Sequence, residues 1–491
     1  MSLSKTLNDF IKYGGTSLWA KIILLFTSAI VSAKILRPDN YGLWIALSLI
    51  LQYGMHLHFG IGNALIREVS FYRGKNDLLE SDKVKNVAFC SMLFFSVITG
   101  AIIFLFSIIF ANKYEKDILA ALKLIALILV VQQIFDFFRR YFIAINNFEA
   151  VGRLKISLSL LTGILTIIFV LKFKLIGLPL ALLFSYSLVL IYIFRRYKIN
   201  ISPELNIKRS LSLIKFGFPI MAGVIVYNLF VTIERPLVLH YFGKLNLGYY
   251  SLACISQDFL VLIPVALGHI VFVNLSQQYG KSGNIKELKE LLSGPTILLS
   301  YILCVVLVII YIFLPVVVKV FLPQYIPGIN FARMALFGIF FLHLYILSGE
   351  FLLVINKQVH YFLFLLLALT MKVIIIYISI VTRMGIYGIV TGAAIVYFLF
   401  SNFIIIYSFL HFEKEFSKLI RYLAQIYAPF LYALLIVFAF HYYMQNLISS
   451  SLGEVNHLLI SVPLLALLLL PLGYVFKILY LKKEIKISGS L

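Results

Sequence analysis

Apolar runs of roughly twenty residues recur along the whole chain, and only short polar gaps separate them. A helix rises about 1.5 Å per residue, so such a run crosses a hydrocarbon core of about 30 Å and satisfies its own backbone hydrogen bonds without water. Of the 491 residues, 62% are hydrophobic and only 13% are charged, which leaves too little polar surface for a soluble multidomain protein. The pattern therefore predicts an all-α polytopic membrane protein.

These runs predict about fourteen transmembrane helices, with bounds good to a few residues. The expected spans are 14–36, 42–64, 87–111, 118–138, 156–173, 176–194, 216–241, 247–273, 295–321, 332–355, 359–381, 385–410, 422–443 and 457–478. The polar N-terminus, MSLSKTLNDFIKYGG, lacks the short apolar core and cleavage site of a signal peptide, so we expect it to stay attached.

Basic residues concentrate on one side of the predicted membrane. With the N-terminus inside, 28 of the 42 lysine and arginine residues fall in cytoplasmic segments, against ten in the opposite loops and adjoining helix ends. The positive-inside rule therefore predicts that both termini are cytoplasmic. This distribution attributes the net charge of +22 to membrane orientation, and we expect no nucleic-acid partner.

Two stretches of the chain echo each other. AKILRPDNYGLW (33–44) and FGKLNLGYYSLA (242–253) align on Asn40-Tyr41-Gly42 and Asn246-Leu247-Gly248, at an offset of 206. Further pairs follow in order at offsets from 203 to 211: IKYG at 11–14 with IKFG at 214–217, Asn112–Tyr114 with Pro323–Tyr325, AINN at 144–147 with VINK at 354–357, and Leu175–Gly177 with Ile386–Gly388. Five matches in order indicate an internal repeat.

The repeat equates helices 1–6 with helices 7–12. Because six is an even number, both halves enter the membrane in the same direction, as in parallel-repeat transporters with a substrate site between the halves. We expect a six-helix lobe at 1–200, a second at 201–412, and two additional helices with a cytoplasmic tail at 413–491. RPDNYG is then the outer turn of the first hairpin, with Pro38 and Gly42 breaking the helix.

Motifs of soluble enzymes are incomplete. Gly280-Lys281-Ser282 imitates the end of a phosphate-binding loop, but Leu275 stands where that loop needs a glycine. Gly60-Ile61-Gly62 lacks the third glycine of a dinucleotide-binding motif. The nine histidines show no metal-ligand spacing, and three cysteines inside apolar runs imply no disulfide framework. We expect no catalytic residue, no metal and no cofactor.

Charges inside the expected spans are better candidates, because each costs about 2.5–3.5 kcal/mol at a helix centre and normally faces a cavity or a partner. Lys21 and Asp258 lie deep by count, which favours a cavity-lining role over a structural ion pair. Glu234 and Arg235 lie either in a cavity or near the outer interface, where their side chains would snorkel to water. For Lys372, a cavity-lining role and a structural role both stay open.

The whole chain resembles the multidrug/oligosaccharidyl-lipid/polysaccharide exporter superfamily, specifically its bacterial polysaccharide flippases. Five loose motifs carry the resemblance through their order and spacing: Ile35–Gly42, Gly60–Ala64 with Arg67 after it, Leu213–Pro219, Gly248–Ser251 and Gly388–Ala394. The resemblance implies two six-helix bundles around a central cavity. It also implies a multi-pass protein of the bacterial inner membrane.

The resemblance further implies a transporter, not an enzyme, that moves undecaprenyl-diphosphate-linked oligosaccharide from the cytoplasmic to the outer leaflet for O-antigen, capsule or exopolysaccharide biosynthesis. Membrane lipid, a polysaccharide polymerase and a chain-length regulator are the partners it suggests. It implies a cationic cavity, to which we assign Lys21, Arg67, Arg235 and Lys372. Asp258 and Glu234 are candidates for ion coupling. In the repeat alignment, at offset 206, Asp258 pairs with Gln52 of the first lobe.

Two other functions stay open. A drug or cation antiporter of the same superfamily would differ only in its cargo. A membrane-embedded polysaccharide polymerase or glycosyltransferase should carry a substantial extramembrane loop, and the longest outer connection here is the short MQNLISSSLGEVNH segment.

Overall fold

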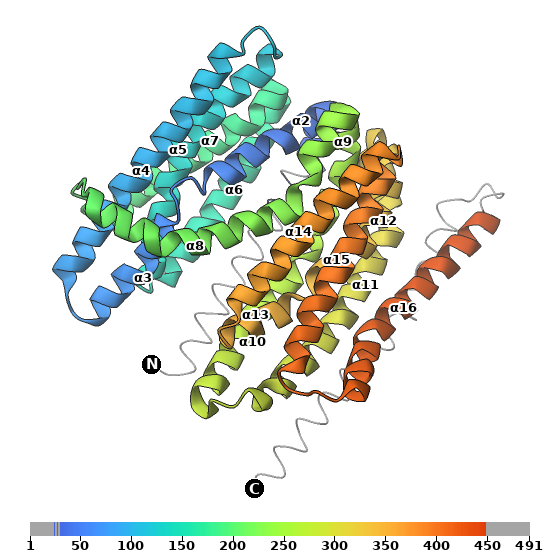
Figure 1. Cartoon of the computed structure of the whole chain (residues 1–491). Coiled ribbons are helices and arrows are strands. Elements are labelled where there is room, and N and C mark those ends of the chain that lie inside the picture. Colours follow the sequence, from blue (N-terminus) through green and yellow to red (C-terminus); the bar gives the residue numbers. More distant parts are fainter. Residues whose placement is uncertain (1–23, 25–26, 28–29, 448–491) are drawn as a thin grey trace. The chain divides into compact units, whose positions relative to one another are not determined.

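The structure is a computed structural model that describes residues 24, 27 and 30–447, and those residues form helices and turns (Figure 1). Nine of their helical stretches are long and apolar enough to cross a membrane, which confirms an all-α polytopic membrane protein. The count of fourteen helices stays a prediction. Most of the first expected span and all of the last, at 457–478, lie outside the described residues.

The described helices divide into two compact units, Met1–Ser251 and Leu252–Leu491. The lobe boundaries expected at residues 200 and 412 stay predictions. The N-terminal unit contains α2 (Ser32–Gly54), α3 (Ile61–Gly74), α4 (Leu78–Ile109), α5 (Lys116–Ala144), α6 (Phe148–Phe173), η2 (Lys174–Ile176), α7 (Gly177–Tyr197), α8 (Ile207–Thr232) and the first part of α9 (Glu234–Leu260). The rest of α9 precedes α10 (Leu262–Ser282), η3 (Ile285–Leu288), α11 (Lys289–Phe321), η4 (Pro323–Gly328), α12 (Ile329–Leu344), α13 (Ile346–Val354), α14 (Gln358–Val381), α15 (Gly385–Leu410) and α16 (Phe416–Leu447).

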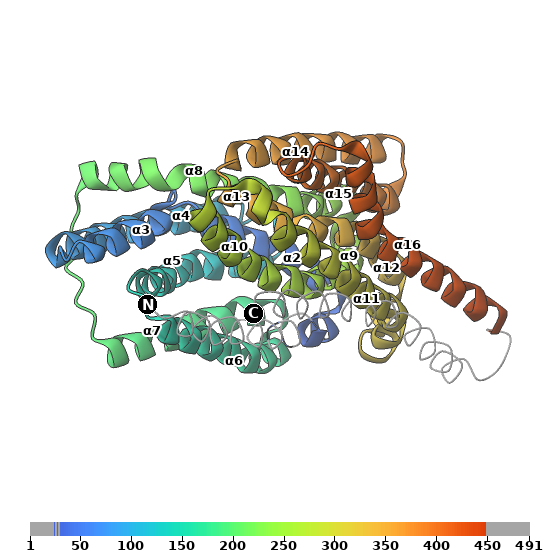
Figure 2. The same cartoon turned by 90° about the horizontal axis from the view of Figure 1, so that it is seen from below.

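In the N-terminal unit α4, α5 and α7 run side by side, and α8 lies against α3 and α4 (Figures 1 and 2). Side-chain caps set where several of these helices begin: Asp77 accepts a hydrogen bond from the Glu80 amide at 3.0 Å, and Asn206 accepts one from the Arg209 amide at 3.0 Å. Apolar side chains from α3 to α8, Phe137 and Phe138 of α5 among them, form the core of this unit.

The expected span 42–64 is not one helix. It ends as α2 at Gly54, passes through turns, and restarts as α3 after Gly60, whose φ is +82°. A Cβ on Gly60 would lie 2.2 Å from the carbonyl carbon and oxygen of Gly217 in α8, so this glycine serves both a left-handed turn and a close backbone approach. Hydropathy alone does not reveal such a break, because the residues on both sides of it are apolar.

The helix break expected at Pro38 and Gly42 lies at a different residue. Arg37, with φ 65° and ψ 165°, interrupts the helix, and Pro38 begins the next helical stretch, where its fixed φ is favourable. Gly42 lies inside that stretch and breaks nothing. At offset 206, Gly243 interrupts α9 with φ 81° and ψ 174°, almost the same conformation as Arg37.

Left-handed residues recur at two further matched positions. Asn146 (φ 57°) follows α5, and Asn356 (φ 59°), at offset 210, follows α13. Lys174 (φ 50°) begins η2, and Gly385 (φ 67°), at offset 211, begins α15. Positive φ angles at positions matched by the sequence alignment support the internal repeat.

A second expected span, 216–241, is divided between α8 and α9. The helix stops at Thr232 and restarts at Glu234, because Pro236 provides no amide hydrogen and its ring crowds the carbonyl four residues earlier, which is that of Thr232. This break places Glu234 and Arg235 in the first turn of α9.

Candidate functional site

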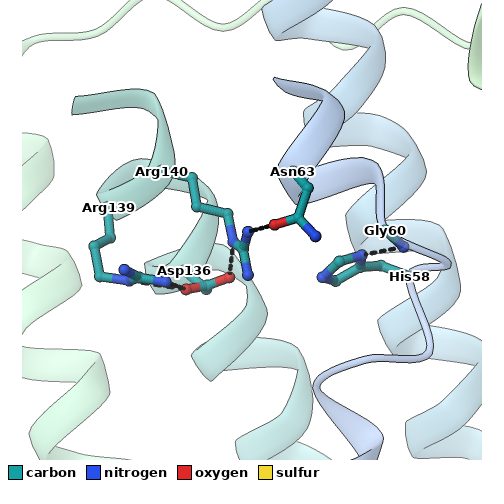
Figure 3. Close-up of polar contacts among 6 residues, drawn as sticks. All are labelled: His58, Gly60, Asn63, Asp136, Arg139 and Arg140. Carbon is teal, nitrogen blue, oxygen red and sulfur yellow. Dashed lines mark hydrogen bonds and ion pairs between the residues drawn. The ribbon is translucent and has the colours of Figure 1, made fainter. Parts of the chain in front are cut away.

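A charged cluster lies inside the N-terminal unit, on one face of α5. Asp136 is only 7% exposed and accepts hydrogen bonds from Arg139, whose Nε lies 2.9 Å away, and from Arg140 (Figure 3). The spacing of three and four residues brings all three side chains to the same helix face. Two guanidinium groups therefore share one carboxylate, and the cluster is positive by one charge.

Arg140 joins this cluster to α3. Its Nη1 donates to Asn63 Oδ1 at 2.6 Å, and a Cβ on Gly62 would lie 2.7 Å from the Arg140 Cδ (Figure 3). The second glycine of Gly60-Ile61-Gly62 thus makes room for an arginine side chain that crosses between helices. We call Asp136, Arg139, Arg140 and Asn63 the arginine cluster.

His58 lies beside the arginine cluster in the turn before α3. It is 3% exposed, and its Nδ1 accepts a hydrogen bond from the Gly60 amide at 3.1 Å (Figure 3). Its Nε2 is buried without a hydrogen-bond partner among the residues that the structure describes. A buried polar atom of this kind provides a hydrogen-bonding position inside the unit.

Further polar contacts line the α2–α3 segment where it faces α8. The Tyr53 hydroxyl lies 2.6 Å from Thr232 Oγ1, and His56 Nε2 lies 3.3 Å from Asn228 Nδ2. These pairs and the arginine cluster place hydroxyl, amide, imidazole and guanidinium groups in an apolar helical bundle. Such groups suit a cargo with hydroxyls and negative charge.

Three of the predicted site residues, Arg67, Glu234 and Arg235, lie among the described residues of the N-terminal unit. The Arg67 guanidinium lies 4.2 Å from the centre of the Phe216 ring of α8 and pairs with Glu68 at 3.0 Å. Glu234 is 2% exposed, and Arg235 is half-buried. Lys21 lies outside the described residues.

The other two predicted residues belong to the C-terminal unit. Lys372 of α14 is fully buried, donates from Nζ to the Tyr397 hydroxyl of α15 at 2.6 Å, and lies 4.4 Å from the centre of that ring. Asp258 of α9 is exposed. Within the described residues, no three histidine, cysteine, aspartate or glutamate side chains gather closely enough to hold a metal ion.

Sequence reasoning missed the arginine cluster. We expected the helix to end at residue 138 and counted Arg139 and Arg140 as cytoplasmic loop residues, but α5 continues to Ala144 and contains them. The spacing of Asp136, Arg139 and Arg140 could have indicated one charged helix face.

A multi-pass helical bundle with buried charges and polar contacts defines an integral membrane protein with a polar interior. The profile of the family described as "Polysaccharide biosynthesis protein" matches residues 31–327, more than half of the chain, and the chain belongs to this family. It is also similar to a Shigella flexneri protein named "Putative O-antigen transporter", with 24% identity over 324 residues that cover 63% of this chain and 75% of the relative.

Solved structures show the same fold. An inward-facing multidrug resistance MATE family transporter of the MOP superfamily has a TM-score of 0.64 at 14% identity, over 81% of this chain and 98% of that one. A MATE transporter of Vibrio cholerae has a TM-score of 0.60 at 14% identity, over 86% and 99%. A MOP superfamily transporter of Pyrococcus furiosus has a TM-score of 0.58 at 14% identity, over 85% and 96%. The fold resemblance expected from the sequence is confirmed.

Proposed function

We propose that this chain is a flippase that moves an undecaprenyl-diphosphate-linked oligosaccharide from the cytoplasmic to the outer leaflet of the bacterial inner membrane, with both termini in the cytoplasm. The observation that carries the proposal is the net positive arginine cluster of a chain in a polysaccharide biosynthesis family. A diphosphate is anionic, and its passage through a low-dielectric bundle needs compensating cations.

The polar groups around the cluster fit the rest of such a cargo. Sugar hydroxyls donate and accept hydrogen bonds, as do the Tyr53 hydroxyl and the Asn228 amide. A cationic drug, the cargo of the alternative antiporter, would meet repulsion from Arg139 and Arg140. Transport would proceed by alternating access, with Asp258 or Glu234 as candidates for ion coupling.

Deletion of the gene should leave lipid-linked oligosaccharide accumulating in the inner leaflet, which loss of a polymerase would not do. Complementation with Arg140→Gln should fail to restore surface polysaccharide at normal protein abundance, and Arg140→Lys should restore part of it, since Lys keeps the charge but loses the fork geometry. Lys116→Gln, an exposed charge loss at the other end of α5, is the matched control and should complement. Full activity of Arg140→Gln would refute the role of the cluster.

A further inference from the structure

A second charged site lies at the end of the N-terminal unit where α3 ends and α4 and α8 begin. It is a cavity of about 580 Å³. Its lining comes from α3, α4 and the first turns of α8, and its charged side chains are Arg67, Glu68, Glu80, Lys208 and Arg209. We call this cavity the basic pocket.

The charges of the basic pocket favour an anion. Three cations, Arg67, Lys208 and Arg209, stand against the carboxylates Glu68 and Glu80. Arg209 Nη2 of α8 lies 2.6 Å from Glu80 Oε2 of α4, whereas Lys208 is exposed. The Arg209–Glu80 pair spans two helices and is only partly exposed, so a group that replaces this carboxylate must be a stronger acceptor.

The pocket is also shaped for a ligand larger than a bare ion. Val84 and Leu213 are buried and provide an apolar floor, and Tyr72 and Phe216 add ring surfaces. The Arg67 guanidinium is oriented by its contact with the Phe216 ring. Cations around an apolar floor match a phosphoryl group that is attached to carbon-rich material, as in a lipid head group.

We propose that the basic pocket binds the phosphoryl head group of a membrane lipid, held by Arg209, Arg67 and Lys208, with Glu80 as the competing carboxylate. A diphosphate carries more charge than a carboxylate, and the phosphodiester of a phospholipid presents two unesterified oxygens to the Arg209 fork while Arg67 and Lys208 lie in the same pocket. Its arrival takes Arg209 from Glu80 and removes the ion pair between α4 and α8. The ligand is either the diphosphate of a polyprenyl lipid, in which case this inference rests on the proposed function, or the phosphate of a resident phospholipid, in which case it goes beyond that function.

The test measures lipid retention by native mass spectrometry on the purified full-length chain, titrated separately with phosphatidylglycerol, a polyprenyl diphosphate and inorganic phosphate. Arg209→Gln should lower the affinity for the retained lipid by about tenfold, the loss of one charge-assisted contact. Glu80→Gln should raise the affinity, because the competing carboxylate is gone. Arg73→Gln removes an exposed charge from the same end of α3 outside the pocket lining and should change nothing.

The three probes separate the sources of the phosphoryl group. Preference for the polyprenyl diphosphate assigns the pocket to the cargo, and preference for phosphatidylglycerol assigns it to a resident lipid. The proposal would be overturned if none of the probes bound. It would also be overturned if Arg209→Gln and Arg73→Gln bound the lipid with equal affinity, or if Glu80→Gln bound it with lower affinity than the unchanged chain. Melting temperatures of all variants check folding, and Arg209→Lys should keep part of the affinity. Lipid retention is measured on the purified chain without any transport step. Failure of the proposed flippase function in a transport assay would therefore not decide whether the basic pocket binds a lipid.

Discussion

Gly42 and Gly248, which the repeat aligns, lie backbone to backbone within the N-terminal unit. A Cβ on Gly42 would lie 2.7 Å from the Gly248 nitrogen and 2.2 Å from the Lys244 carbonyl oxygen, and a Cβ on Gly248 would lie 1.9 Å from the Pro38 carbonyl oxygen. Pro38 and Lys244 are themselves 206 residues apart. The contact is therefore reciprocal, as at a twofold axis between like elements.

Gly248→Ala should lower the free energy of unfolding by about 1–3 kcal/mol or more, because its new methyl group would meet a backbone carbonyl that cannot rotate away. Thermal unfolding of the purified chain measures the effect. Gly280→Ala is the control: a Cβ there meets nothing within 4 Å, and alanine favours the helix. Equal melting temperatures for the two variants would show that the close approach is absent.

Asp136→Asn should destabilise the chain by about 3–5 kcal/mol, since it leaves Arg139 and Arg140 without their shared counterion inside the unit. Glu149→Gln breaks a pair of the same i, i+4 geometry with Arg153 at the exposed start of α6, and should cost under about 1 kcal/mol. Thermal unfolding again provides the comparison. A loss as small as that of Glu149→Gln would mean that water compensates the arginine cluster.

The proposed orientation is tested by labelling from outside the cell. In a cysteine-free background, a membrane-impermeant thiol reagent should label Lys244→Cys and spare Lys75→Cys. Lys75 is exposed and the Lys244 side chain is 39% exposed, so both positions are accessible at the protein surface and only the side of the membrane distinguishes them. Labelling of Lys75→Cys from outside would show that the proposed orientation is wrong.

Lys21→Ala should abolish surface polysaccharide at normal protein abundance, because Lys21 lies too deep in the first expected span to snorkel easily and would compensate the cargo charge. Lys21→Arg should retain part of the activity, since only the geometry changes. Surface polysaccharide and immunoblots of the membrane fraction are the measurements. Normal transport by Lys21→Ala would remove this residue from the cationic site.

Several features were predictable because they are written along the chain. Hydropathy runs predicted a polytopic helical protein, since each span must satisfy its own backbone in lipid. The pairing of Asn40-Tyr41-Gly42 with Asn246-Leu247-Gly248 also marked positions where Arg37 and Gly243 share one conformation. Arg67 lines the basic pocket, and its assignment to a cationic cavity stays a prediction.

The sequence by itself thus determined the class of fold and the order of its elements, because the apolar length and loop charge of each segment are local quantities. Tertiary structure decided where charge is buried. Arg139 and Arg140 follow an apolar run in sequence and looked like loop residues, yet α5 continues and α3 offers Asn63 to one of them. Whether a charged side chain faces solvent, lipid or a partner depends on which helices pack against it, and no local pattern records that choice.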